Sequence, residues 1–149
     1  MEEFNSGVKD GIPYVDYRTR VRYGETDKMK VGYYGNYAVW FEAGRSTYGR
    51  VRDMPYSDFE EQGYYAVVAE LYCRYINSVR YDDEIIVRTS ITEVTRRTVK
   101  FEYEVFLAES MKLCATGYTK HVCISKDGRV TGLPDKWLAL KDRLKKRLD

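Results

Sequence analysis

A change of hydrophobic period near Tyr64 constrains the fold of this 149-residue chain more than any other feature. From that point apolar side chains recur at every second residue, as they do in strands that are covered on one face. Between Thr98 and Leu107, for example, apolar residues alternate with Lys100, Glu102 and Glu104. Short polar segments separate the alternating stretches and suit hairpins. The sequence therefore predicts four strands, at 65–76, 84–94, 98–107 and 113–125.

One helix precedes these strands. Its apolar side chains fall at helical spacing and form one stripe, made of Tyr37, Trp40, Phe41, Gly44, Tyr48 and Val51. The stripe predicts a helix over residues 36–52, and Asn36 is a residue type that caps helix N-termini. A further strand is predicted at 14–23, a short helical piece at 56–62 and a short C-terminal helix after Pro134. This order favours an α+β fold in which an antiparallel sheet of about five strands wraps around one long helix.

Composition narrows the class of protein. The net charge is +2, and no block of one sign occurs before the last dozen residues, which argues against general nucleic-acid binding. The chain has an odd number of cysteines, Cys73, Cys114 and Cys123, and no two of them are spaced as a CxxC pair. A disulfide framework or a zinc site is therefore not expected. The cysteines are expected to be small buried hydrophobic residues. We expect a cytoplasmic protein without a membrane span, because no apolar run approaches about 20 residues.

Domain organisation is expected to be simple. Residues 1–13 are polar and predict an N-terminal tail, and residues 14–149 predict a single domain. One layer of sheet leaves its edges open, so self-association is expected.

The loop before the long helix holds the candidate chemistry. Asp27 lies in a polar, Gly-containing loop a few residues before that helix begins. A carboxylate that faces a helix N-terminus is a minimal arrangement for attack on a carbonyl group. The alternative is that Asp27 only caps its loop through hydrogen bonds to nearby backbone.

The segment from Tyr23 to Arg45 resembles the signature of the 4-hydroxybenzoyl-CoA thioesterase family, whose members have the hotdog fold. The matching residues are Thr26-Asp27, Val31, Tyr33-Tyr34, Asn36-Tyr37 and Phe41-Glu42-x-x-Arg45. The resemblance covers about residues 15–130. It implies a homodimer or homotetramer that hydrolyses an acyl-CoA or aryl-CoA thioester to the free acid and CoA. It implies no cofactor, since the CoA thioester is the substrate.

The resemblance also implies roles for individual residues. Asp27 would be the nucleophile or the general base, and backbone N–H groups of Tyr34, Gly35 and Asn36 would form the oxyanion hole. Two positions depart from the common pattern. Many acyl-CoA members have a Gly where this chain has Lys30, and many have a His where it has Tyr34. A role for a histidine at that position therefore does not carry over.

Other candidate site residues have a plain structural alternative. Tyr33, Tyr37 and Glu42 are candidates for the acyl pocket, although Tyr37 lies on the apolar stripe and Glu42 could form a salt bridge with Arg45. The candidates for contacts with CoA are Arg96, Arg97 and Lys100, which could equally form an ordinary solvated hairpin. His121, the only histidine, is expected on a sheet surface or as a satisfied histidine.

Two other functions remain open at the level of sequence. The first is a non-catalytic hotdog protein that binds acyl-CoA or an acyl carrier. The second is a related hotdog dehydratase, although that activity usually requires a His with an acid in the site, and His121 is poorly placed for it.

Overall fold

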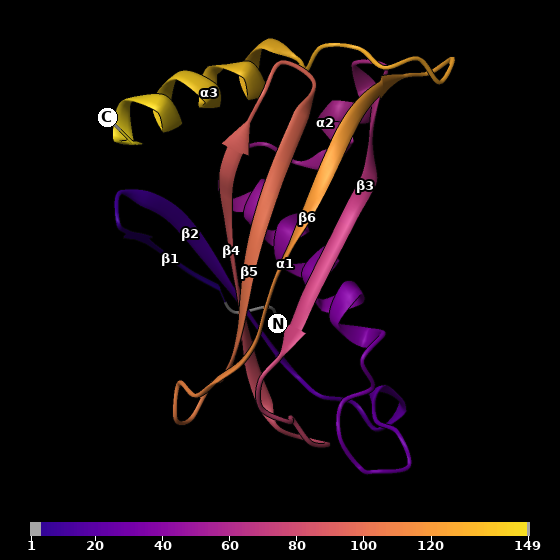
Figure 1. Ribbon diagram of the computed structural model, residues 1–149, viewed down its shortest axis with the longest axis vertical. Coiled ribbons are helices and arrows are strands. Elements are labelled where there is room, and N and C mark those ends of the chain that lie inside the picture. The colour runs from indigo at the N-terminus through magenta and orange to yellow at the C-terminus, as the bar shows by residue number, and fades with distance from the viewer. Residues whose placement is uncertain (1–3, 149) are drawn as a thin grey trace.

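The computed structural model describes residues 4–148, and a six-stranded antiparallel sheet forms its framework (Figure 1). The order across the sheet is β1-β2-β4-β5-β6-β3. The third strand in the chain therefore lies at one edge, beside the last. The strands are β1 (Phe4–Lys9), β2 (Ile12–Arg20), β3 (Tyr64–Tyr75), β4 (Glu84–Val94), β5 (Thr98–Leu107) and β6 (Leu113–Ser125).

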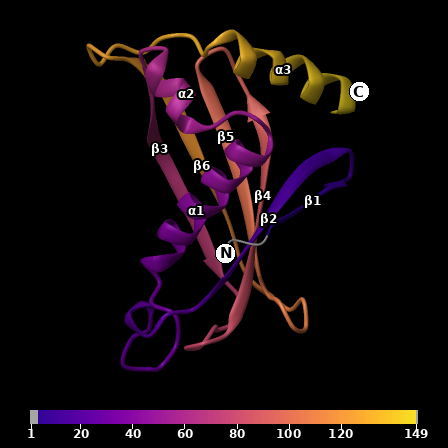
Figure 2. The same cartoon turned by 180° about the vertical axis from the view of Figure 1, so that it is seen from behind.

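Helix α1 (Asn36–Val51) crosses one face of this sheet (Figure 2). The predicted apolar stripe is the buried face of the helix, and only Val51 is less than fully buried. Phe41 is completely buried and stacks on Tyr103 of β5, with 4.2 Å between ring centroids. The prediction of an antiparallel sheet wrapped around one long helix is therefore confirmed.

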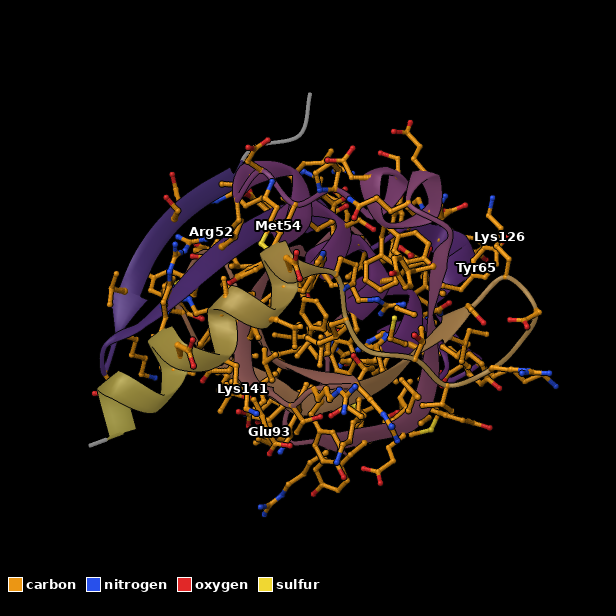
Figure 3. All side chains as sticks on the ribbon, turned by 90° about the horizontal axis from the view of Figure 1, so that it is seen from above. Arg52, Met54, Tyr65, Glu93, Lys126 and Lys141 are labelled. Atoms are coloured by element: carbon orange, nitrogen blue, oxygen red, sulfur yellow. The ribbon has the colours of Figure 1, made fainter. Side chains whose placement is uncertain are left out.

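The two ends of the sheet differ. The loop that joins β2 to α1 lies at one end, at the bottom of Figure 1. The short helix α2 (Tyr56–Glu61) and the C-terminal helix α3 (Asp135–Leu148) lie at the other end. Figure 3 looks onto that second end, where α3 crosses between Met54 on one side and Glu93 on the other. Trp137 of α3 packs against Phe59 of α2 at 5.6 Å between ring centroids.

The predicted strands at 84–94, 98–107 and 113–125 match β4, β5 and β6 residue for residue. The predicted N-terminal tail, residues 1–13, is wrong for residues 4–13: residues 4–9 form β1, which pairs with β2, and β2 begins at Ile12. Residues 1–3 lie outside the described part of the chain. Asp10 and Gly11 have φ angles of 52° and 78°, the left-handed geometry of a tight hairpin turn. Since the β1 segment is polar and contains Gly7, its own pattern carries little strand signal, and pairing with β2 sets its conformation.

Strand β3 is an exposed edge. Side chains on both of its faces reach solvent, and six large ones are 39–51% exposed: Tyr65, Val67, Val68, Leu71, Tyr72 and Tyr75. An apolar edge strand of twelve residues offers an unpaired row of backbone N–H and C=O groups. No helix in the described part of the chain is long and apolar enough to cross a membrane.

Candidate active site

The loop that carries Asp27 is folded tightly on itself. After the 3₁₀ turn at Tyr23–Glu25, the Asp27 N–H donates to the carbonyl of Val31 at 3.0 Å, and the Lys30 N–H donates to the carbonyl of Asp27 at 2.9 Å. Lys30 has a φ of 65°, a left-handed conformation that glycine adopts at little cost. This geometry gives a physical reason why a glycine suits this position in the signature.

The Asp27 carboxylate is half-buried, and among residues 4–148 only one of its two oxygens has a hydrogen-bond partner. Its Oδ1 accepts a hydrogen bond from the Met29 N–H at 2.8 Å, which fixes the rotamer of the side chain. Within residues 4–148, no lysine or arginine forms an ion pair with it. The carboxylate is therefore oriented by backbone and keeps one oxygen available for a substrate or a water.

The start of α1 supplies backbone donors. In the described structure the N–H groups of Tyr34 and Gly35 have no acceptor, whereas the Asn36 N–H donates to the carbonyl of Tyr33 at 3.0 Å. Of the three predicted oxyanion donors, two therefore present a free N–H and the third is engaged. A free N–H at a helix N-terminus favours a negatively charged oxygen.

The prediction that Asn36 caps α1 is wrong. The N-cap position is Gly35, and no side chain caps the helix there. The Asn36 side chain instead donates through Nδ2 to the carbonyl of Glu25 at 2.7 Å. The carbonyl of Glu25 also accepts the Tyr33 N–H at 2.8 Å. Asn36 therefore ties the helix to the Asp27 loop rather than closing its own first turn.

Glu25 is a site residue that the sequence did not single out. Its side chain is buried, with 6% of the residue exposed. Oε1 accepts the backbone N–H of Arg22 at 2.7 Å, and Oε2 accepts the indole N–H of Trp40 at 2.9 Å. The spacing of Trp40, fifteen positions further along, gives no local signal that would have revealed this contact.

The tyrosines near Asp27 do not form one pocket. The rings of Tyr33 and Tyr34 contact each other at 4.5 Å between centroids, and both are exposed. Tyr37 is buried against Trp40 and Tyr75, so it is a core residue. The Tyr75 hydroxyl donates to the carbonyl of Tyr34 at 3.0 Å, and burial raises its pKa to about 12, which keeps it protonated at neutral pH.

A cavity of about 230 Å³ lies at the opposite end of α1. Its walls come from α1, α2, β3, β5, β6 and α3, and are mainly apolar and aromatic. The lining includes Glu42, Arg45, Phe59, Phe101, His121 and Trp137. Glu42 and Arg45 form no ion pair with each other in the described structure, so the salt-bridge alternative for Glu42 is not observed. Glu42 is instead an exposed residue at the cavity.

His121 is a buried, satisfied histidine in the wall of this cavity. Nε2 hydrogen-bonds to the Thr119 hydroxyl at 2.8 Å, and the ring meets the edge of Phe101. Burial, followed by the nearby positive charge of Arg45, lowers the pKa of His121 to about 4. The ring is therefore neutral at neutral pH, and the satisfied-histidine prediction is confirmed. Cys123 also lines the cavity, and burial raises its pKa to about 11.

The basic residues predicted to contact CoA divide between two places. Arg96 and Arg97 are exposed in the β4–β5 hairpin, at the cavity end of the sheet. Lys100 points to the sheet face opposite α1, with its ammonium 4.5 Å from the centre of the Tyr118 ring. The three do not form a single cluster, and none lies at the Asp27 end of the same chain.

Comparison with known proteins decides the family. The family model of the thioesterase superfamily matches residues 29–114. The chain belongs to the thioesterase superfamily. The matched range begins just after Asp27, so the match itself assigns no role to that residue. The predicted hotdog fold is confirmed by this match and by solved structures of the same fold.

Several members of the superfamily are similar over most of their length. The DHNA-CoA thioesterase of Staphylococcus aureus is 32% identical, with 91% of this chain and 90% of that one covered and a TM-score of 0.79. Protein TT1821 of Thermus thermophilus is 31% identical, with 87% and 98% covered and a TM-score of 0.80. The acyl-CoA thioesterase YbgC of Haemophilus influenzae is 34% identical over 84 residues, which are 56% of this chain and 62% of the relative. The family match and the two relatives named as thioesterases support thioester hydrolysis as the general activity, while a specific 4-hydroxybenzoyl-CoA assignment stays a prediction.

Proposed function

We propose that this protein hydrolyses an acyl-CoA or aryl-CoA thioester to the free acid and CoA, with Asp27 as nucleophile or general base. The observation that carries the proposal is the Asp27 carboxylate, which is fixed through one oxygen by the Met29 N–H and free at the other. It lies in the loop that leads into the two unpaired N–H groups of Tyr34 and Gly35. Relatives named as DHNA-CoA and acyl-CoA thioesterases support this reaction class.

The chemistry needs only these groups and water. As a base, Asp27 takes a proton from a water whose oxygen adds to the thioester carbonyl carbon. The tetrahedral intermediate then collapses, the C–S bond breaks and CoA leaves as the thiolate. As a nucleophile, it adds directly, forms an acyl anhydride with loss of CoA thiolate, and water then hydrolyses the anhydride. In either route the carbonyl oxygen gains negative charge, which the N–H groups of Tyr34 and Gly35 stabilise. The proposal requires no cofactor and assigns the protein to the cytoplasm, where CoA thioesters are metabolised.

The proposed functional unit is a homodimer, or a tetramer built from it, joined through β3. The apolar edge of this strand is suited to pair with the same strand of a second copy, in antiparallel orientation about a two-fold axis. Such pairing extends the sheet and covers Val67, Val68 and Leu71, which are 43–51% exposed in the single chain.

Antiparallel pairing would combine the two ends of the molecule. Near the start of β3, Ala66 lines the cavity, and at its end Tyr75 is bonded to Tyr34 beside the Asp27 loop. A two-fold axis near the middle of β3 brings the Asp27 loop of one copy towards the cavity of the other. The cavity and Glu42 would then receive the acyl group, and Arg96 and Arg97 would lie at the same end as the partner's reacting carboxylate.

The test is a panel of acyl-CoA and aryl-CoA thioesters assayed by release of free thiol. The Asp27→Asn variant should lose about 10²- to 10⁴-fold in kcat, as expected when a positioned base is removed. Asp142→Asn, a change at an exposed residue of α3, is the matched control and should retain full activity. Equal rates for Asp27→Asn and the unchanged protein would refute the role of Asp27. Tight CoA binding by calorimetry with no turnover of any thioester would instead favour the non-catalytic binding function.

A further inference from the structure

Glu25 is a buried carboxylate that the reaction itself does not use. Moving a charged group out of water is costly unless hydrogen bonds compensate it. Both oxygens of Glu25 are used, one by the backbone N–H of Arg22 at 2.7 Å and one by the indole N–H of Trp40 at 2.9 Å. The Arg22 guanidinium adds a longer contact, with Nε 3.5 Å from Oε1. A side chain held this closely fixes the position of its own backbone.

The backbone of the same residue forms a second set of contacts. The carbonyl of Glu25 accepts the Tyr33 N–H at 2.8 Å and the Asn36 side chain at 2.7 Å. Glu25 therefore joins the entry of the loop at Arg22, its exit at Tyr33, and the first two turns of α1 at Asn36 and Trp40. Asp27 lies two residues further along, inside the loop that these contacts close.

We propose that Glu25 is the positioning residue that sets the Asp27 carboxylate relative to the free N–H groups of Tyr34 and Gly35. This inference rests on the proposed thioesterase function. Glu25 does not touch the substrate; it acts by holding the loop and the helix N-terminus in one rigid unit. A displacement of about 1 Å between reacting groups can reduce a rate by about 10²-fold, so such a unit bears directly on kcat.

The first variant is Glu25→Gln, which keeps the shape of the side chain. One oxygen is replaced by an NH₂ group, which then faces the N–H of Arg22 or of Trp40, so one of the two hydrogen bonds is lost. We expect kcat to fall by about 10- to 100-fold while KM changes by less than about three-fold. Glu25→Ala loses both hydrogen bonds, so its kcat should be lower still.

Asp16→Asn is the matched control for loss of a buried carboxylate. Asp16 is also 6% exposed and accepts two hydrogen bonds from Arg88, at 2.8 and 2.9 Å, but it lies on β2 within the sheet. It should lower stability and leave kcat within about two-fold of the unchanged protein. A purely structural role for Glu25 predicts the same behaviour for both variants.

Trp40→Phe supplies the second test of the same contact. It retains an aromatic ring in the core but removes the N–H that Glu25 accepts. Its effect on kcat should be non-additive with that of Glu25→Ala, because both changes remove the hydrogen bond between Glu25 and Trp40. Amide hydrogen exchange should also accelerate at Asp27, Lys30 and Tyr33 in Glu25→Gln and not in Asp16→Asn.

The outcomes separate this inference from the proposed function. If Asp27→Asn is inactive while folded Glu25→Gln keeps kcat within about two-fold of normal, the positioning role is refuted and the proposed function stands. If Asp27→Asn is fully active, or if the unchanged protein hydrolyses no thioester, the proposed function fails and the positioning role fails with it. A reduced kcat in Glu25→Gln, faster amide exchange in its Asp27 loop and non-additivity of Glu25→Ala with Trp40→Phe would together establish the positioning role of Glu25.

Discussion

Gly117 of β6 leaves no space for a side chain, and replacing it with alanine should destabilise the protein strongly. A Cβ atom at this position would clash with the backbone oxygen of Tyr72 on β3 and lie 2.7 Å from the Phe41 ring. The first atom belongs to the β3–β6 ladder and cannot rotate away. Relief therefore requires β3 and β6 to separate locally or α1 to move outward with Phe41.

The magnitude follows from these contacts. Weakening about two ladder hydrogen bonds costs roughly 1 kcal/mol each, and displacing Phe41 adds an overpacking cost of about 1–3 kcal/mol. Removing the flexibility of glycine from the unfolded chain offsets about 0.5–1 kcal/mol. The free energy of unfolding of Gly117→Ala should therefore fall by about 2–4 kcal/mol.

Urea unfolding followed by circular dichroism measures this change. With a slope of about 2 kcal/mol per molar urea, the midpoint should move down by about 1–2 M. Gly24→Ala is the control, because nothing lies within 4 Å of a Cβ there, and its stability should change by less than about 1 kcal/mol. In a Phe41→Leu background the cost of Gly117→Ala should shrink by about 1 kcal/mol. A Gly117→Ala protein as stable as the unchanged one would refute the reasoning.

Four further predictions follow from single residues. Thr89 is fully buried and its hydroxyl has no hydrogen-bond partner among the described residues, so Thr89→Val should raise the free energy of unfolding by about 1 kcal/mol in urea titrations; a loss would contradict this. Lys30 has a φ of 65°, so the β-branched Lys30→Ile should cost about 1–2 kcal/mol in the same assay, while Lys30→Gly should be nearly neutral. Burial lowers the pKa of His121 from 6.5 to about 4, so the imidazole is protonated at higher pH in the unfolded chain than in the folded one. The free energy of unfolding should therefore fall by at most about 3 kcal/mol as the pH drops from about 6.5 to 4. His121→Gln should flatten this part of the stability–pH curve, and an unchanged slope would exclude His121 as its source. Leu71→Glu places a charge on the β3 edge and should yield monomers with little hydrolysis, as measured by light scattering and thiol release; an active monomer would contradict the composite site.

Much of the fold could be predicted because local pattern and tertiary environment agree. Strand β5 alternates along its buried face, β4 and β6 alternate over most of their length, and turn residues bound all three, so period two indicates both their identity and their ends. Strand β1 could not be predicted in this way, because its polar segment takes its conformation from pairing with β2. The buried stripe of α1 was predicted from spacing alone, since one face of an isolated apolar helix must be covered.

The site was less predictable because its contacts are not local. Asp27 and the backbone donors of Tyr34 and Gly35 lie close in sequence and were identified together. Asn36 was assigned to a cap by residue type, but a carbonyl eleven positions earlier competes for its side chain. The cavity is assembled from six elements between α1 and α3, so no single stretch of sequence describes it.

The place of β3 in the sheet also has a consequence during synthesis. This strand leaves the ribosome before its ladder partner β6, because β4 and β5 lie between them in the sequence. While β4, β5 and β6 are still being made, the apolar side chains of β3 have no native strand beside them. Nascent chains on one polysome would hold identical unpaired strands near each other, and long-range pairing forms slowly. The segment that forms the edge of the finished sheet is therefore exposed to non-native pairing until β6 has been made.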